Sequence, residues 1–171
     1  IIGSRSNTFV YSVAADANDT VQVWGMGSAV YVRDNWSNIT ADQVEIDSKA
    51  YIGYTNSTTQ STTTKYGVYT WLRACANINA AKIYGASYGV YIKDSHTSVT
   101  NITGGEIKGG TYAIYILTQH TSSNLYYGNT VNITGGTLIG GSNAVIYSTV
   151  QNSVPTTTKN TISIGPNVIV G

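Results

Sequence analysis

Residues 101–116 read NITGGEIKGGTYAIYI, and residues 132–147 read NITGGTLIGGSNAVIY. Similar lines begin at residue 77, NINAAKIYGASYGVYI, and at residue 38, NITADQVEI. VQVWGMGSAVYV from residue 21 matches the later part of the unit, and NTISIGPNVIVG from residue 160 matches its start. A sequence segment that recurs several times along one chain indicates a repeat fold. The starts at residues 77 and 101 lie 24 residues apart, which we take as the bare unit.

Each unit divides into three short segments in which apolar and polar residues alternate. Alternation with a period of two predicts strands, and the Gly-Gly pairs between segments predict tight bends. The Asn-Ile-Thr phrase is the first segment, and a small residue followed by Val/Ile-Tyr-Val/Ile is the third. The second segment is centred on an aliphatic residue in each unit: Val44, Ile83, Ile107 and Leu138. Three strands and three bends predict a triangular coil, and stacked coils make a parallel β-solenoid.

These phrases, together with the closing TISIGPNVIVG, resemble the right-handed parallel β-helix of the pectin-lyase-like superfamily. They resemble in particular the repeats of large microbial adhesin-like surface proteins, and the resemblance covers most of residues 18–171. The resemblance implies an all-β, right-handed parallel β-helix of about six triangular coils. It implies one domain over residues 1–171, with loop insertions at about 53–65 and 119–130. Activity does not follow, because that superfamily includes lyases, hydrolases, tailspikes and inert stalks.

Two other features bear on the fold and on the parent chain. A β-sandwich is the rival fold, but it needs antiparallel hairpins, and a unit recurring in phase argues against them. The chain opens on IIGSRS and closes on the apolar VIVG. We therefore expect it to be a segment or a processed form of a longer chain.

The composition narrows the class of protein. Only 10% of the residues are charged and the net charge is +1, so we expect no nucleic-acid partner. No apolar run reaches the length of a membrane span, and we expect no membrane insertion in this segment. The lone Cys75 excludes an internal disulfide. A polar surface with few charges favours an extracellular or cell-surface location.

Alternation in the third segment assigns the faces of its strand. The inward positions are Val30, Val68, Val90, Ile114 and Val145, accompanied by Val32, Ile92 and Ile116. The outward residues between them form a column: Tyr31, Tyr69, Tyr91, Tyr115 and then Ile146. We therefore predict an exposed tyrosine ladder. It either stabilises the sheet through cross-strand stacking or forms a contact surface for sugar rings or another copy of the chain.

A second column follows five residues later and contains both histidines: Trp36, Ala74, His96, His120 and Gln151. Trp36 would extend the contact surface. His96 and His120 with Asp94 are the weak candidates for a metal site, but two exposed turn histidines explain the pattern better. We therefore predict no metal and no cofactor.

The asparagines of the first segment recur at equivalent places: Asn38, Asn77, Asn101 and Asn132. They predict an asparagine ladder that joins successive coils at a bend. Several asparagines also lie in N-x-S/T sequons. The candidates for glycosylation lie outside the repeat positions: Asn18, Asn35 and Asn56.

Catalysis would need clustered acids, and the candidates are Glu45 and Asp47, which could form a dyad or bind Ca²⁺ with Asp42. The sequence has no phosphate-loop or zinc motif. We therefore expect a non-catalytic extracellular structural or adhesive protein that contacts glycans or other copies and can assemble into fibres. The alternative is a polysaccharide lyase, hydrolase or phage tailspike fragment acting on a surface glycan.

Overall fold

The computed structural model describes residues 2–3, 10–13, 20–33, 43–93, 98–118, 128–142, 144–150 and 159–171. Within these ranges the protein is all-β and forms sixteen strands. The same ranges hold no helix that is long and apolar enough to cross a membrane. The predicted all-β class is confirmed.

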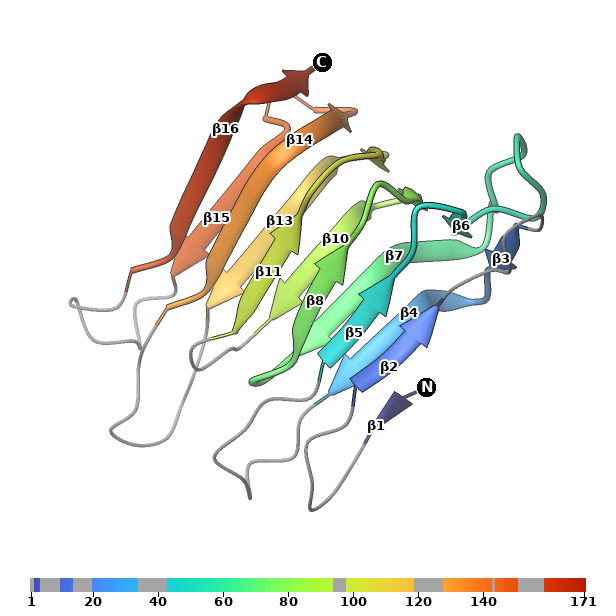
Figure 1. The fold of residues 1–171 in the computed structure, drawn as a ribbon, viewed down its shortest axis with the longest axis horizontal. Coiled ribbons are helices and arrows are strands. Elements are labelled where there is room, and N and C mark those ends of the chain that lie inside the picture. Colours follow the sequence, from blue (N-terminus) through green and yellow to red (C-terminus); the bar gives the residue numbers. More distant parts are fainter. Residues whose placement is uncertain are drawn as a thin grey trace.

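The strands form two parallel sheets (Figure 1). The six-stranded sheet contains, in spatial order, β1 (Ile2–Gly3), β4 (Gly27–Arg33), β7 (Thr64–Trp71), β10 (Tyr88–Lys93), β13 (Tyr112–Thr118) and β15 (Ile146–Val150). All of its strand pairs are parallel.

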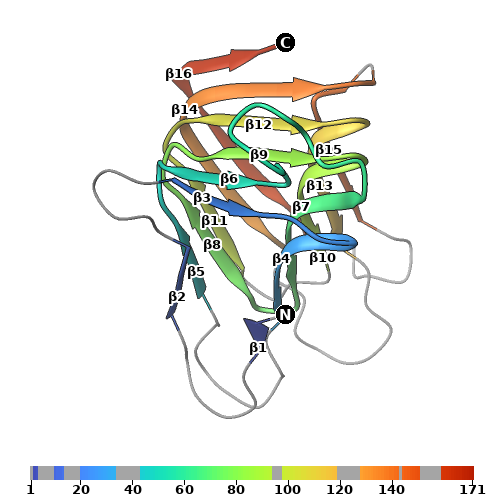
Figure 2. The same ribbon diagram turned by 90° about the vertical axis from the view of Figure 1, so that its right-hand side faces the viewer.

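The second sheet is strongly curled and has two arms (Figure 2). The first arm contains β2 (Val10–Val13), β5 (Gln43–Ile46), β8 (Cys75–Ile78) and β11 (Val99–Ile102). The second arm contains β3 (Val21–Val23), β6 (Ala50–Ile52), β9 (Lys82–Gly85) and β12 (Glu106–Gly109). The long β14 (Thr130–Gly140) pairs with β11 through its first half and with β12 through its second, and β16 (Thr161–Val170) pairs with β14.

The chain visits the first arm, the second arm and the six-stranded sheet in turn, once in each unit. Two consecutive passes are β8–β9–β10 and β11–β12–β13, and each strand pairs with its equivalent in the next pass. Residues one unit apart are therefore neighbours, roughly 4.8 Å apart in the hydrogen-bonding direction. The repeated phrase is thus a structural unit, because each copy can bury its apolar face only against its neighbours.

One core lies between the two arms and the six-stranded sheet. Fully buried residues from all three line up in columns, among them Ile78 and Ile102, Ile83 and Ile107, and Ile92. The predicted inward residues Val30, Val68, Val90 and Ile114 are buried, as are Val32, Ile92 and Ile116.

The glycine pairs of the repeat do make bends. Gly105 has a φ of 85° and Gly136 has a φ of 104°, in the left-handed region that glycine adopts without strain. A Cβ on Gly105 would lie 2.1 Å from the Ala81 carbonyl oxygen of the preceding unit. Glycine at this position therefore allows both the turn and the close stacking of successive units.

The asparagine ladder is present, but it lies within strands and not at bends. Asn77, Asn101 and Asn132 are in register on β8, β11 and β14. Asn101 Nδ2 donates to Asn77 Oδ1 over 2.7 Å, and Asn132 Nδ2 donates to Asn101 Oδ1 over 3.0 Å. Glu45 takes the next place, and its Oε1 accepts a hydrogen bond of 2.6 Å from Asn77 Nδ2.

Two sequence alignments of the repeat were wrong around this ladder. Glu45, not Asn38, stands opposite Asn77, so Val44 belongs to the first arm opposite Ala76, and Ile52 is the true partner of Ile83. The segment QVEI has the apolar alternation of the first segment but lacks its Asn-Ile-Thr sequence, so it was assigned to the second segment. Asn38 itself lies outside the described residues.

A second polar ladder, which was not predicted, precedes the strands of the first arm. Asn129 is fully buried, accepts a hydrogen bond from Ser98 Oγ (2.8 Å) and donates through Nδ2 to Thr118 Oγ1 (2.9 Å). Asn160 Oδ1 accepts from the Asn129 backbone N–H over 2.9 Å. Asn160 therefore aligns with Asn129, one unit apart, and not with Asn132 as the sequence suggested.

Candidate functional site: a tyrosine face

The outer face of the six-stranded sheet carries two columns of tyrosines. The first contains the four predicted residues in register: Tyr31, Tyr69, Tyr91 and Tyr115. It continues to Tyr147, and not to Ile146 as we expected. The shift arises because β15 pairs Ile114 with Ile146 and not with Val145, so the chain holds one extra residue before this strand.

The second column was not predicted. Tyr66, Tyr88 and Tyr112 are also in register on β7, β10 and β13. We call the outer surface formed by both columns the tyrosine face, and its members are Tyr31, Tyr66, Tyr69, Tyr88, Tyr91, Tyr112, Tyr115 and Tyr147.

Both columns can share one face because each strand bends at a small residue. In a regular strand, residues three apart point to opposite faces. Here Tyr88 and Tyr91 enclose two successive buried residues, Gly89 and Val90, and the same pattern recurs in β7 and β13. A Cβ on Gly89 would lie 2.6 Å from Ile107 Cγ2 and 2.8 Å from the Ala113 carbonyl oxygen. The signal in the sequence was the spacing YGVY, YGVY and YAIY, with a small second residue.

The rings stack on one another along and across the columns. Tyr69 and Tyr91 have ring centroids 4.7 Å apart and planes 20° apart, and Tyr91 and Tyr115 follow at 5.4 Å and 18°. The second column stacks likewise, with Tyr66 and Tyr88 at 5.5 Å and 17°. Aromatic pairs in this distance range each contribute about 0.5–1.5 kcal/mol beyond the area they bury. The tyrosine face is therefore a rigid array.

The stacking changes what the face presents to solvent. We predicted an exposed ladder, but Tyr91 retains only 8% of its accessible surface because neighbouring rings cover both of its flat sides. Most other rings of the face are half-buried, and Tyr147 is the most open at 41%. Between neighbouring rings the flat sides are occupied, so they are not open to a ligand.

Three phenol groups of the face have a raised pKa. Burial raises the pKa of Tyr31, Tyr88 and Tyr115 above the usual 10.0. For Tyr88 and Tyr115, the neighbouring tyrosines raise the pKa further, because a second phenolate would repel the first.

Positive side chains lie at the margin of the face. Arg33, Trp71 and Lys93 form a further column in register. The Arg33 Cζ lies 4.2 Å from the Trp71 ring centroid and the Lys93 Nζ lies 5.4 Å from it, so the indole is held by cation–π contacts. Lys65 Nζ lies 5.3 Å from the Tyr66 ring centroid.

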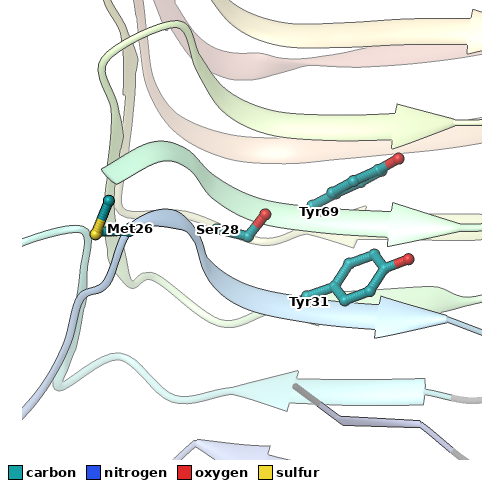
Figure 3. A pocket seen from close by; sticks show the side chains of 4 residues that line it. All are labelled: Met26, Ser28, Tyr31 and Tyr69. Carbon is teal, nitrogen blue, oxygen red and sulfur yellow. The ribbon is translucent and has the colours of Figure 1, made fainter. Parts of the chain in front are cut away.

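One end of the face is hollow. A depression of about 240 Å³ is lined by Met26, Ser28, Tyr31 and Tyr69 (Figure 3). Met26 is 89% exposed. In Figure 3 the Ser28 side chain lies between Met26 and the two rings.

The candidate catalytic carboxylates have structural partners. Glu45 Oε1 accepts from Gln43 Nε2 as well as from Asn77, so it terminates the asparagine ladder. Asp47 Oδ1 accepts from Ser48 Oγ and from the Lys49 backbone N–H. The hydrogen bond from Ser48 is the main reason why the pKa of Asp47 is lowered. Asp42 lies outside the described residues, within which no group of three His, Cys, Asp or Glu side chains could hold a metal ion.

Asn56 is the one glycosylation candidate that the structure describes. It lies in the connection between β6 and β7, residues 53–63, and is exposed. Its Oδ1 accepts from the Thr58 backbone N–H, the Thr58 hydroxyl and the Thr59 backbone N–H. The connection is anchored by Tyr54, which is 3% exposed and whose ring packs 6.2 Å from that of Tyr84.

The remaining candidate residues lie outside the described ranges: Asn18, Asn35, Trp36, Asp94, His96 and His120. So does most of the second predicted insertion, residues 119–127.

No protein-family model, curated protein or solved structure matches this chain.

Proposed function

We propose that the chain is a right-handed parallel β-helix serving as a non-catalytic extracellular adhesive scaffold, and that it contacts glycans through the tyrosine face. Support for the β-helix comes from the parallel pairing of successive units in both arms and in the six-stranded sheet. Parallel strands in one sheet are joined by right-handed connections in nearly all proteins, which favours the right hand. The likeness to adhesin repeats of the pectin-lyase-like superfamily belongs to the same proposal.

The observation that carries the functional proposal is the continuous array of eight tyrosines. The array combines aromatic rings with phenol hydroxyls, a group that can both donate and accept hydrogen bonds. Sugars present the complementary chemistry, since their rings combine apolar C–H groups with many hydroxyls. Because the rings are already fixed by stacking, binding costs little side-chain entropy.

The non-catalytic part of the proposal rests on the hydrogen bonds of the candidate acids. Glu45 accepts hydrogen bonds from two side-chain amides, and Asp47 accepts hydrogen bonds from the two residues that follow it. Each carboxylate therefore has a structural role. A general acid or nucleophile would instead need a carboxyl group that faces a bound sugar.

Self-association is a second candidate function. It is favoured by the exposed apolar side chains of β16, where Ile164, Ile169 and Val170 are 53%, 65% and 56% exposed. Strands of a second copy could cover them by parallel pairing. Negative-stain electron microscopy tests this directly: fibres with a regular axial repeat are expected, and isolated short rods would contradict it.

A glycan array tests the main proposal. Labelled protein is expected to bind at least one class of glycan saturably, and the bound glycans should release no new reducing ends on incubation. Cleavage of a bound glycan would favour the lyase or hydrolase alternative. Absence of binding to plant, bacterial and host glycans would contradict the proposal.

A further inference from the structure

The hollow at the end of the tyrosine face occupies a position that tyrosine fills in the following units. Ser28 pairs with Tyr66, which pairs with Tyr88, which pairs with Tyr112. Ser28-Ala29-Val30-Tyr31 thus has the pattern of Tyr88-Gly89-Val90-Tyr91, with a hydroxymethyl group where the first ring should be. The second column therefore lacks one ring at its N-terminal end.

The contacts made by the other rings of this column follow one rule. Each touches the tyrosine three residues later in its own strand and the equivalent tyrosine in the next strand. The ring centroid of Tyr88 lies 5.4 Å from that of Tyr91 and 4.6 Å from that of Tyr115. The ring centroid of Tyr66 lies 5.6 Å from that of Tyr69 and 5.1 Å from that of Tyr91.

The same rule identifies the neighbours of the missing ring. A ring at position 28 would touch Tyr31 and Tyr69, which are the two tyrosines that line the hollow, and it would stack on Tyr66 within its own column. Their centroids are 4.8 Å apart and their planes are tilted by 42°. We propose that the hollow is a binding site for one phenol-like aromatic ring, supplied by a molecule other than this segment of the chain.

The size and lining of the hollow agree with one ring. Its volume of about 240 Å³ is below the roughly 300–1,000 Å³ of pockets for drug-sized ligands. The thioether of Met26 suits the edge of an aromatic ring, and the Ser28 hydroxyl can bond a phenol hydroxyl. A free phenol and a tyrosine side chain on a peptide share this chemistry.

The chain provides its own reporter for a test. Met26 is the only methionine, so labelling methionine methyl groups with carbon-13 gives one signal at the hollow. Titration with p-cresol is expected to shift this signal saturably, with a Kd on the order of 1 mM as befits a single ring. Cyclohexanol, which has a similar size and a hydroxyl but no aromatic ring, should give no saturable shift.

Two variants control the site. Ser28→Tyr places the missing ring in the hollow and should weaken p-cresol binding at least tenfold. Ser28→Ala keeps the hollow open and removes only one hydrogen-bond partner, so it should weaken binding by about threefold to fivefold. Intermolecular NOEs from the p-cresol ring to the Met26 methyl in the wild type provide evidence that does not depend on the Ser28→Tyr variant folding.

The outcomes separate clearly. A shift that stays linear with p-cresol concentration, or is equal in the wild type and in folded Ser28→Tyr, would overturn the proposal. N-acetyl-tyrosinamide then identifies the source: equal binding indicates that a peptide side chain can enter, and binding of p-cresol alone indicates a free phenol. Neither result depends on glycan binding, so this site and the proposed function can fail separately.

Discussion

The asparagine ladder should contribute measurably to the stability of the stack, and Asn101 is the residue that tests it. Asn101→Ala removes two side-chain hydrogen bonds, one to Asn77 over 2.7 Å and one from Asn132 over 3.0 Å. Each such bond contributes about 1 kcal/mol net, and the groups left without partners in a half-buried column add to the loss. We therefore expect the free energy of unfolding to fall by about 2 kcal/mol.

Urea unfolding followed by far-UV circular dichroism measures this change. With an m-value of about 2 kcal/mol per molar urea, the midpoint should fall by about 1 M. Asn167→Ala is the matched control, because Asn167 lies exposed on β16 and should cost less than about 0.5 kcal/mol. Producing both variants in a host that does not glycosylate asparagine removes any effect of losing the sequon at Asn101. If the two midpoints fall equally, the ladder does not stabilise the stack.

Three further predictions concern other parts of the fold. Gly89→Ala should lower the free energy of unfolding by about 1–3 kcal/mol in a urea titration, because the new Cβ would overlap Ile107 and the Ala113 carbonyl. Gly25→Ala is the control and should be nearly neutral, because the atom nearest to its new Cβ would be 3.8 Å away. Thr100→Val should raise the unfolding midpoint by an amount equivalent to about 1 kcal/mol, because the fully buried Thr100 hydroxyl has no hydrogen-bond partner among the residues that the structure describes. An unchanged or lower midpoint would contradict this. Stability should fall as the pH rises above 10.0, because the pKa values of Tyr31, Tyr88 and Tyr115 are raised in the folded state and the unfolded chain therefore loses these protons first. A urea midpoint that stays constant as the pH rises through and above 10.0 would refute this prediction.

Much of the architecture could be predicted because its signals are local. Alternation identifies strands, glycine pairs identify bends, and the gapless repeats at residues 101 and 132 align Ile107 with Leu138 correctly. The sequence alignment of the repeat units was wrong where a unit differs in residue type from the others or is one residue longer. Glu45 replaces asparagine in the ladder, and the extra residue before β15 moves Tyr147, rather than Ile146, into the tyrosine column.

The candidate site was only half predictable for a different reason. Strict alternation puts Tyr88 and Tyr91 on opposite faces, so only one tyrosine column could be derived from it. The bend at Gly89 that unites them depends on close contact with the next unit, which no local pattern contains. The hollow beside Ser28 becomes meaningful only when the register with Tyr66 is known.

The central claim is that the tyrosine face is the surface that contacts glycans, and comparing variants of two tyrosine clusters tests it most directly. Affinity for the strongest binder from the array would be measured by biolayer interferometry for three proteins: the wild type, Tyr112→Ser/Tyr147→Ser on the face, and Tyr51→Ser on the second arm. Tyr51 packs edge-on against Tyr54, whose hydroxyl donates to Glu106, so it serves as an aromatic control away from the face. With all three proteins shown to be folded by circular dichroism, we predict at least a tenfold loss of affinity for the face variant alone. Equal affinity in the face variant and the wild type would contradict the proposal that this face binds glycans.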